Sequence, residues 1–557
     1  MNAVERRRLE LAKKCVRFGK FEYASLVIGK LMESQTIQDD AELLAEISKL
    51  YISMGKNRTA LTYSHRAFDL EKNVDNLELL ANVNFLCENY EDAAIEFEEL
   101  LKYKDDERFI EYCCESYNKM DIKEEAIRIA KLGIEKFNTV NAYSRLSFLY
   151  ITIGMEKEAI ECCEEMKEKF ANNSVTYNNL GFLYEAIYND YEKAKEYFKK
   201  AAKLGLIEAY YNLGVCCKQS EDLKNAEKYL KKIISLNPDI KVDYNYTLGS
   251  VYMAQRKLAL GYKYYQKRSS SNALKLRYKN KLWNGKDYPE EVLYVHSEQG
   301  FGDNIQFIRY IPIVAKKFKK VIYAVPVNLL ELFQYSFSGE EFSNIEIVSI
   351  EETVRCNKFA LIMDLPYLLH ANFHNIPSKE GYLKVSERSQ ELFKTNFFKT
   401  DKIKIGLNWR AKGMGLRDAV YRTIDAPYYF KDFLDIPEVD YYSFQMGDIF
   451  GMCEKYPNII DISKQINTFN DTAAALKNLD ILITVDTALA HLAGALGVKT
   501  YLLLCHAPDW RWFDNDKKTE WYSSVTIIKQ QDRKTWEDVA EKLNNYIRKD
   551  IKNINIG

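Results

Sequence analysis

Residues 480–503 read DILITVDTALAHLAGALGVKTYLL. The apolar run at 480–486 predicts a buried strand, the residues after it predict a helix, and TYLLLC at 500–505 predicts a second strand. Strands that alternate with helices imply a parallel sheet. This stretch therefore indicates an α/β domain in the second half of the chain.

Apolar runs on both sides of this stretch extend the pattern into two sets of strands, which a polar segment near 386–402 separates. We expect two Rossmann-like lobes with parallel sheets that face one cleft, with an amphipathic helix at 305–318 in the first lobe. The predicted strands are 292–296, 321–326, 345–350 and 359–364 in the first lobe, and 404–409, 441–446, 480–486, 500–505 and 524–529 in the second.

The chain before residue 275 has a different composition. It holds one proline, Pro238, and no tryptophan, whereas nine prolines and all six tryptophans follow, and scarce proline suits long helices. Alanine recurs there about every 33 residues within phrases such as NYEDAAIEFEELL and IKEEAIRIAKLGI. A small residue at this period lets two helices approach closely and stack on the next pair. The recurring residues are Ala60, Ala93, Ala126, Ala159, Ala194 and Ala226.

These phrases, with their companions NLGFLYEA, NLGVCC and TLGSVYMA, resemble tetratricopeptide repeats over roughly residues 41–265. The resemblance implies an α-solenoid whose concave groove holds an extended segment of another protein. Alternatively, the helices only brace the second half or form a contact between two copies, so a homo-oligomer stays open. We expect a helical repeat array at 1–270, a first lobe at 271–400 and a second lobe at 401–557.

Charge and cysteine content exclude several classes of protein. The 79 basic residues balance the 80 acidic ones, so net charge favours neither nucleic acid nor an anionic membrane as a partner. The start of the chain lacks the apolar segment of a secretory signal, and no run reaches the roughly 18 apolar residues of a membrane helix. Eleven cysteines without Cys-x-x-Cys spacing indicate reduced thiols. We expect a cytoplasmic protein without membrane insertion.

The first candidate site lies in HSEQGFGDNIQFIRYIP, residues 296–312, where the first strand ends. Ligands of open α/β sheets bind at the carboxyl ends of strands, so this loop should border the cleft. Gly300 and Gly302 allow a tight backbone, and Asp303 opens the helix. Asp303 either caps that helix or is a catalytic carboxylate that takes a proton from an acceptor hydroxyl.

The second candidate site is the start of the helix in the opening stretch. The free backbone N–H groups of Thr487, Ala488 and Leu489, with the positive end of the helix dipole, suit a diphosphate. His491 lies four residues after Thr487 on the same helical face, and it either reaches the donor or packs in the core. Asp486 either caps the helix or contacts the bound ligand.

A basic loop, GLNWRAKGMGLRDAVYRTID at 406–425, forms the third candidate. A leaving group with two negative charges needs compensation by such donors, particularly without a metal, although a solvated loop is the alternative. The donors are Asn408, Arg410, Lys412, Arg417 and Arg422. No Walker A motif, His-Glu-x-x-His pattern or paired zinc ligands occur, so we expect no metal and no cofactor.

Two motifs carry a resemblance to a known family. E-Q-G-x-G-D-x-I-Q-F-x-R-Y at 298–310 and D-T-x-x-x-H-L at 486–492 resemble the bacterial tetratricopeptide-glycosyltransferase group, itself similar to the heptosyltransferases. The resemblance implies the GT-B fold, with Asp303 as general base. By this resemblance the loop supporting the base contains Gly300, Gly302 and Gln306, and the donor site contains Asp486, Thr487 and His491.

Smaller segments resemble the same group and also depart from it. R-T-I at 422–424 matches the group's R-S-I, which favours Arg422 as a donor ligand. SFQMG at 443–447 resembles S-L-Q-K-G, which implies a base or ribose contact at Gln445, but Met446 replaces the lysine, so the donor's identity stays open. PDWRWF at 508–513 resembles C-terminal aromatics of the group, which either shape the cleft or pack.

The family resemblance implies an inverting glycosyltransferase. Its expected donor is UDP-N-acetylglucosamine, and its expected acceptors are Ser or Thr hydroxyls of a protein such as flagellin. One alternative is an enzyme of heptosyltransferase type that modifies lipopolysaccharide. Another is a non-catalytic scaffold whose degenerate transferase half steadies the repeats.

Overall fold

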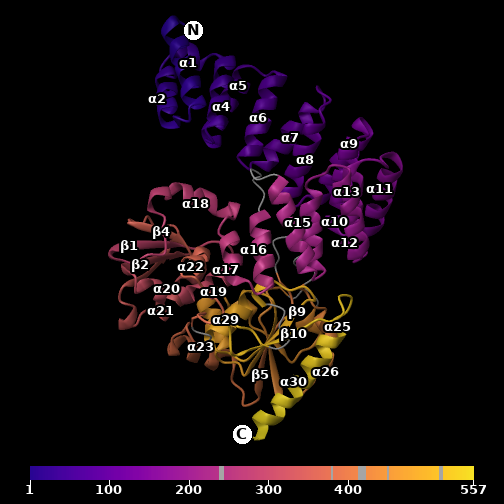
Figure 1. Ribbon diagram of the computed structural model, residues 1–557, viewed down its shortest axis with the longest axis vertical. Coiled ribbons are helices and arrows are strands. Elements are labelled where there is room, and N and C mark those ends of the chain that lie inside the picture. The colour runs from indigo at the N-terminus through magenta and orange to yellow at the C-terminus, as the bar shows by residue number, and fades with distance from the viewer. Residues whose placement is uncertain (237–243, 378–380, 412–421, 448–450, 513–517, 557) are drawn as a thin grey trace. The chain divides into compact units, whose positions relative to one another are not determined.

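The computed structural model describes residues 1–556 except 237–243, 378–380, 412–421, 448–450 and 513–517 (Figure 1). The chain divides into two compact units, Met1–Leu206 and Ile207–Gly557. The first unit consists of helices and their connections, and the second combines further helices with two parallel sheets. The last helices of the predicted repeat array therefore belong to the unit that holds the sheets.

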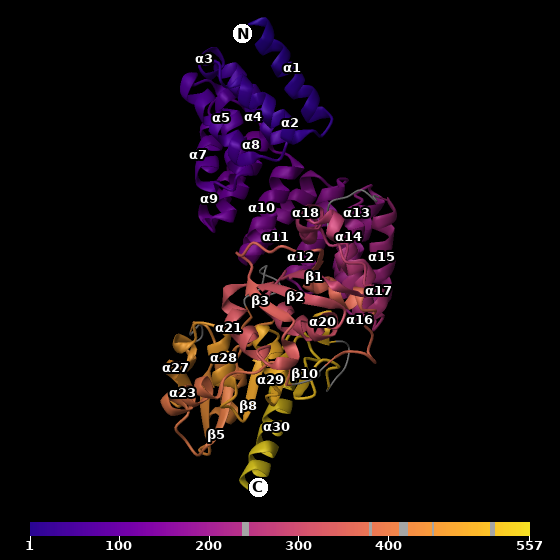
Figure 2. The same cartoon turned by 90° about the vertical axis from the view of Figure 1, so that its left-hand side faces the viewer.

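The first unit is a series of helices in which neighbours along the chain pack together (Figure 1 and Figure 2). Polar side chains recurring every 33 or 34 residues accept backbone N–H groups and fix where the first helix of a pair begins. These caps are Asp40, Asn73, Asp106, Thr139 and Asn173. The helices are α1 (Ala3–Arg17), α2 (Phe21–Leu31), α3 (Gln35–Gln38), α4 (Ala41–Ser53), α5 (Asn57–Leu70), α6 (Val74–Leu86), α7 (Tyr90–Leu100), α8 (Glu107–Lys119), α9 (Lys123–Phe137), α10 (Val140–Ile153), α11 (Glu156–Lys169), α12 (Ser174–Ala186) and α13 (Tyr191–Lys203).

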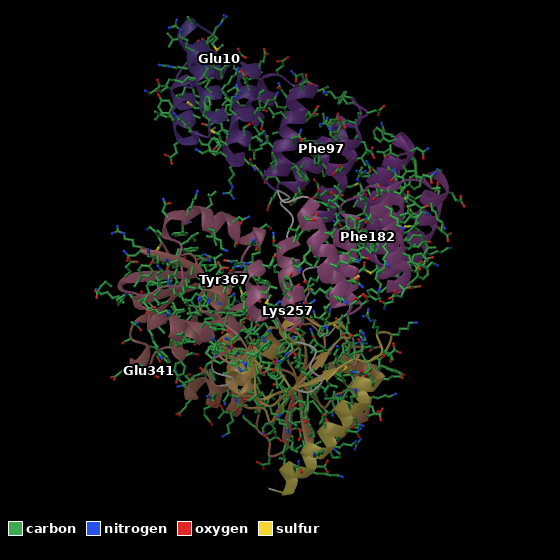
Figure 3. The ribbon with its side chains drawn as sticks, in the orientation of Figure 1. Glu10, Phe97, Phe182, Lys257, Glu341 and Tyr367 are labelled. Atoms are coloured by element: carbon green, nitrogen blue, oxygen red, sulfur yellow. The ribbon has the colours of Figure 1, made fainter. Side chains whose placement is uncertain are left out.

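Small residues let paired helices approach closely, as the repeat period predicts. All six recurring alanines are fully buried. At Gly181 on α12, an added Cβ atom would lie 2.5 Å from the Phe198 ring on α13, which is closer than van der Waals contact allows. Large rings fill the space between pairs: Phe97, labelled in Figure 3, is buried with its ring 5.9 Å from that of Phe109 on α8.

The turn inside each helical pair contains a residue with positive φ. Gly55, Glu88, Asp121 and Gly154 occupy this position 33 residues apart, with φ of 71°, 65°, 63° and 84°. Left-handed backbone is favourable for glycine and strained for other residues. The same turn is therefore relaxed in some repeats and strained in others.

The second unit begins with the last helical pairs, α14 (Ala209–Gln219), α15 (Leu223–Leu236), α16 (Tyr244–Ala254) and α17 (Leu258–Tyr265). At Gly249 on α16, an added Cβ atom would lie 2.8 Å from the backbone nitrogen of Tyr265 on α17, so glycine permits direct backbone contact. The segments η1 (Ser269–Ser271), α18 (Asn272–Arg277) and η2 (Lys279–Lys281) lead into the first sheet.

The first sheet has four parallel strands in the order β3-β2-β1-β4, which confirms that four strands form there. The strand predicted at 359–364 ends earlier, at Leu361, where a 3-10 turn begins. The single amphipathic helix predicted at 305–318 is wrong: α19 ends at Phe307, the 3-10 turn η3 follows, and α20 begins at Ile311. Pro312 explains the break, because proline lacks an N–H and its ring clashes with the carbonyl four residues earlier. The elements are β1 (Tyr288–His296), α19 (Phe301–Phe307), η3 (Ile308–Tyr310), α20 (Ile311–Ala315), β2 (Phe318–Val325), α21 (Val327–Ser336), η4 (Glu340–Phe342), β3 (Ile345–Ser349), β4 (Lys358–Leu361), η5 (Ile362–Asp364) and α22 (Leu365–Leu368).

The second sheet has parallel strands in the order β10-β9-β8-β5-β6-β7. Its strand β7 was not predicted, because three residues are too short to show a pattern. The polar segment between the lobes forms α23, which Ser386 caps. The elements are α23 (Glu387–Phe397), β5 (Ile403–Asn408), α25 (Ala426–Tyr429), α26 (Lys431–Leu434), β6 (Val439–Ser443), α27 (Met452–Lys455), β7 (Ile459–Asp461), η6 (Ser463–Gln465), α28 (Phe469–Leu476), β8 (Ile481–Val485), α29 (Ala488–Leu496), β9 (Thr500–Leu504), η7 (Trp510–Trp512), β10 (Val525–Lys529) and α30 (Glu537–Ile556).

One apolar core runs through most of the second unit. It joins Tyr262 and Tyr265 of α17, the interior of the first lobe, and Leu489 and Leu492 of α29. A second core lies on the opposite face of the second sheet, where residues of β5, β6 and α30 meet. Because the first core is continuous, the end of the repeats, the first lobe and one face of the second lobe support one another.

Candidate functional site

Three of the predicted site residues follow or end strands at points where the order of each sheet reverses. Asp303 follows β1, which lies between β2 and β4, and Asn408 ends β5, which lies between β6 and β8. Thr487 follows β8. Carboxyl ends of strands at such reversal points are where open α/β sheets bind ligands. The topology therefore places Asp303, Asn408 and Thr487 at the sheet edges where open α/β sheets generally bind ligands.

Helix α19 of the first lobe lies against α29 of the second (Figure 1). An added Cβ atom on Gly302 would lie 3.0 Å from Cδ2 of His491 and 3.4 Å from Cα of Ala488. The absence of a side chain at Gly302 thus lets the two segments touch. Since Asp303 is the next residue of α19, its backbone lies close to the start of α29.

Asp303 is the third residue of α19, and Gly300 immediately precedes the helix. Oδ2 of Asp303 accepts the Gly300 N–H at 3.0 Å, and Oδ1 accepts a hydrogen bond from Nη2 of Arg511. The carboxylate therefore closes the helix start with one oxygen and pairs with a guanidinium through the other. Its side chain is 16% exposed, so it is accessible from a restricted direction.

Arg511 is a site residue that the sequence pattern did not single out. Its Nε donates to Oε1 of Gln306 at 3.1 Å, and its Nη1 donates to Oδ1 of Asp509 at 2.7 Å. Gln306, predicted to support the base, is thus linked to Asp303 through this guanidinium. One feature of the sequence could have identified Arg511: it lies between two tryptophans in PDWRWF. Such neighbours indicate burial, and a buried arginine is usually paired with another polar group.

Asn408 and Gln445 meet at the ends of β5 and β6. Oε1 of Gln445 accepts Nδ2 of Asn408 at 3.2 Å and the backbone N–H of Arg410 at 2.9 Å. Oδ1 of Asn408 in turn accepts the hydroxyls of Thr484 at 3.1 Å and Thr487 at 3.5 Å. The structure brings Asn408, Gln445 and Thr487 together, and side-chain hydrogen bonds join them to one another and to the backbone.

The Thr487 side chain accepts no hydrogen bond from the backbone N–H groups at the start of α29, although Thr487 occupies the capping position. Thr487 and Ala488 are partly exposed, whereas Leu489 is buried. The N–H of Leu489, the second residue of α29, is therefore not satisfied by the side chain that would ordinarily cap it.

Arg422 lies beside this helix start. Its Nη1 donates to the carbonyl oxygen of Asp486 at 2.8 Å and is 3.8 Å from Oδ2 of the same residue. Burial raises the pKa of Asp486 to about 6, and the Arg422 charge opposes that rise. The Arg410 side chain is exposed, and Lys412 and Arg417 lie outside the described residues.

His491 lies in the protein interior with 5% of its surface exposed. Its Nδ1 shares a hydrogen bond with the Tyr522 hydroxyl at 2.9 Å, and its ring stacks on Trp512 with 4.9 Å between centroids. Burial lowers the pKa of His491 to about 3, and the nearby Arg511 charge acts in the same direction. This placement fits the core-histidine alternative, and contact with a donor stays a prediction.

The loop that precedes α19 is anchored to the end of the repeats. Arg268, which is fully buried, pairs with Glu298 and with Asp364, the latter at 2.9 Å. The Tyr265 hydroxyl donates to Oε1 of Gln299 at 2.9 Å, and Gln299 has a left-handed φ of 59°. A strained backbone persists only where its surroundings hold it, so α17 fixes this loop.

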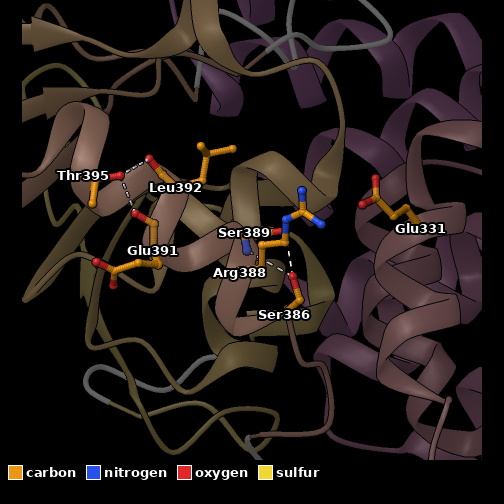
Figure 4. A pocket seen from close by; sticks show the side chains of 7 residues that line it. All are labelled: Glu331, Ser386, Arg388, Ser389, Glu391, Leu392 and Thr395. Atoms are coloured by element: carbon orange, nitrogen blue, oxygen red, sulfur yellow. Dashed lines mark hydrogen bonds between the residues drawn. The ribbon is translucent and has the colours of Figure 1, made fainter.

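A separate hollow of about 660 Å³ lies on the second unit, between α21 and α23 (Figure 4). Glu331, Ser386, Arg388, Ser389, Glu391, Leu392 and Thr395 line it, and none of these belongs to the predicted site.

Within the part of the chain that the structure describes, no three His, Cys, Asp or Glu residues gather to hold a metal ion. Among the same residues, none of the helices combines the length and apolar character needed to cross a membrane.

Known proteins resemble parts of this chain. Residues 175–204 and 207–240 match the tetratricopeptide repeat family. Protein FlbA of Caulobacter vibrioides is 21% identical over 432 residues, which span 71% of this chain and 70% of that protein. Mitochondrial protein MSS2 of Saccharomyces cerevisiae is 28% identical over 116 residues, 20% of this chain and 32% of that protein.

Two solved tetratricopeptide repeat structures are also similar. One, from Parabacteroides merdae, has a TM-score of 0.34 at 14% identity and covers 42% of this chain and 96% of its own. The other, from Thermus thermophilus, has a TM-score of 0.28 at 18% identity and covers 32% and 99%. The chain is thus a tetratricopeptide repeat-containing protein in which helical repeats precede a region of parallel sheets.

Proposed function

We propose that this protein is an inverting glycosyltransferase that moves a sugar from a nucleotide-diphospho-sugar to a protein hydroxyl. The observation that carries the proposal is the close approach of Gly302 to Ala488, since it sets the Asp303 loop beside the start of α29. Such an enzyme needs a carboxylate toward the acceptor and an anion site toward the leaving group. The weak similarity to Protein FlbA, which extends beyond the repeats, is in keeping with the proposal.

In the proposed reaction, Asp303 takes the proton of the acceptor hydroxyl. Each carboxylate oxygen of Asp303 accepts one hydrogen bond in the structure and keeps a further lone pair for that proton. The hydroxyl oxygen bonds to the anomeric carbon as the bond from this carbon to the diphosphate oxygen breaks. The nucleoside diphosphate leaves with the electron pair, and attack from the opposite face inverts the anomeric centre.

In this scheme the second lobe compensates the negative charge of the leaving diphosphate. Backbone N–H groups and the dipole at the start of α29 stabilise the developing negative charge. Arg422, held beside Asp486, adds a positive charge at the same place. These protein groups supply the compensation, so the proposed reaction needs no metal ion.

The proposed acceptor is a Ser or Thr hydroxyl of a protein, because tetratricopeptide repeats form extended surfaces that bind other proteins. A flagellin is the first acceptor to test, and UDP-N-acetylglucosamine is the first donor. Lipopolysaccharide with a nucleotide-heptose donor is the comparison that tests the alternative acceptor class.

The test incubates the purified full chain with each donor and acceptor, with EDTA present, and measures nucleotide diphosphate release and the mass of the acceptor. Asp303→Asn should lower turnover by about 10²- to 10⁴-fold, the usual effect of losing a general base. Asp287→Asn, which removes an exposed carboxylate of the same lobe paired with Lys317, is the matched control and should keep turnover. Full turnover by Asp303→Asn excludes this base, and a folded protein that binds no nucleotide diphosphate is a scaffold.

A further inference from the structure

The short helix η7 presents consecutive side chains to different elements of the second unit. A 3-10 helix turns by about 120° per residue, so neighbouring side chains diverge. Trp510 packs against Tyr265 on α17 with ring centroids 6.0 Å apart, Arg511 bonds Asp303 on α19, and Trp512 stacks on His491 of α29. This helix therefore connects the end of the repeats, the proposed base and the helix of the proposed donor site.

Arg511 is held so that its guanidinium has one orientation. Its side chain is 11% exposed, and its backbone carbonyl accepts Nε1 of Trp521 at 2.6 Å. Each nitrogen of the fork bonds a different partner: Nε bonds Gln306, Nη1 bonds Asp509 and Nη2 bonds Asp303. A planar guanidinium can hold three partners in fixed directions, whereas a lysine ammonium is a single compact charge on a flexible stem.

The contacts of Arg511 fix Asp303 from the side opposite its helix. The Gly300 N–H, just before α19, holds one carboxylate oxygen, and Arg511 holds the other from η7. Two anchors on different elements leave the carboxylate little freedom to rotate. Asp509 keeps the guanidinium in place independently, and Arg511 in turn holds the pKa of Asp509 below its ordinary value even though burial acts to raise it.

We propose that Arg511 is the positioning residue of the Asp303 base, an inference that rests on the proposed transferase function. Arg511 orients the carboxylate and compensates its charge between turnovers. When Asp303 takes the acceptor proton, Gln306 and Asp509 still hold the guanidinium, so the base returns to the same orientation after it releases the proton.

The experiment compares Arg511→Gln, Arg511→Lys and wild type in the full chain, measuring kcat, KM for each substrate and the pH dependence of kcat. A base misplaced by about 1 Å loses roughly 100-fold in rate, so Arg511→Gln should lower kcat about 100-fold. Loss of the neighbouring positive charge should also move the acidic limb of the profile to higher pH. Arg511→Lys should return the acidic limb to its wild-type pH because lysine keeps the positive charge. Its kcat should stay low because lysine lacks the planar guanidinium.

Arg548→Gln is the matched control, because this exposed arginine of the same lobe donates to the backbone carbonyl of Asp432 and should keep kcat and the pH profile unchanged. Folding of each variant is checked by circular dichroism and nucleotide diphosphate binding by calorimetry. An active wild type with unchanged kcat and pH profile in Arg511→Gln overturns the positioning role alone. A change confined to the KM of the donor makes Arg511 a donor ligand instead. A folded wild type that transfers no sugar and binds no nucleotide diphosphate overturns the proposed function, and with it the role of Arg511.

Discussion

Arg268, three residues beyond the last repeat helix, is fully buried against Asp364 of the first lobe, with 2.9 Å between Nη1 and Oδ1. The same guanidinium pairs with Glu298 at the start of the loop that leads to Asp303. Lys275 also contacts Asp364, at 2.8 Å. The end of the repeats and the proposed base loop therefore share one buried ionic cluster.

Replacing Arg268 should strongly destabilise the second unit. Arg268→Gln leaves Glu298 and Asp364 buried with less compensation, and breaking a buried pair in this way costs about 3–5 kcal/mol in the free energy of unfolding. The control is Arg256→Gln, which breaks the more exposed pair with Glu520 and should cost less than about 1 kcal/mol. Urea unfolding measures both, and equal losses would contradict the ionic role of Arg268.

A side chain at position 302 should separate the two lobes. In Gly302→Ala the new Cβ meets His491 and Ala488 at 3.0 and 3.4 Å, so α19 or α29 must shift. Overpacking of this kind costs roughly 1–3 kcal/mol, and the shift should also lower any sugar transfer. Gly29→Ala is the control: Gly29 is an exposed helical glycine with no atom within 4 Å of the added Cβ, so its replacement should stabilise by about 1 kcal/mol. Unchanged thermal stability and turnover in Gly302→Ala would show that the lobes do not need this contact.

Glycine should relieve the strained turns of the repeats. Glu88 is exposed and has a φ of 65° at the turn position that Gly55 and Gly154 occupy in other repeats. Glu88→Gly should therefore stabilise the first unit by up to about 1 kcal/mol, because left-handed backbone strains a non-glycine residue by 1–2 kcal/mol and glycine's greater unfolded entropy offsets part of the gain. The reverse change, Gly154→Ala, should destabilise by a similar amount, and chemical denaturation that moves both variants in one direction would refute the strain argument.

Two buried groups of the second lobe should give opposite pH dependences. Burial lowers the pKa of His491 from 6.5 to about 3, so between these pH values the unfolded chain binds a proton at this residue and the folded chain does not. The contribution of His491 to stability is therefore lost as pH falls below about 6.5. Asp486 has its pKa raised from 3.8 to about 6 by burial, so its contribution is lost as pH rises from about 4 to 6. In the wild type these two contributions partly cancel between pH 4 and 6.

Single variants expose each contribution. Relative to wild type, His491→Gln should gain stability as pH falls from 6.5 to 4, and Asp486→Asn should gain stability as pH rises from 4 to 6. Each slope should approach at most about 1.4 kcal/mol per pH unit, the limit for one proton. The measurement is the free energy of unfolding from urea titrations at several pH values. Subtracting the wild-type value cancels the contributions of all other titratable groups. Slopes of equal sign would disprove the assignment.

The sequence by itself determined the repeats and most of the strands, because both arise from local periodicity. A helical pair buries a small residue once per repeat, so the alanines from Ala60 to Ala226 mark the array without knowledge of its partners. Buried parallel strands need continuous apolar runs, so 480–486 and 500–505 are visible in the chain as strands. The glycines at 300 and 302 and the aspartate at 303 likewise mark a tight turn into a helix.

Tertiary structure alone decided which polar groups meet. Arg511 bonds Asp303 across 208 positions of sequence, and no local pattern encodes a contact that depends on the packing of η7 against α19. The burial of His491 likewise follows from the rings of Trp512 and Tyr522, which reach it only once the C-terminal segment is in place. Pairing of buried polar groups is a property of the assembled core, because their desolvation must be offset by whichever partners the fold brings near.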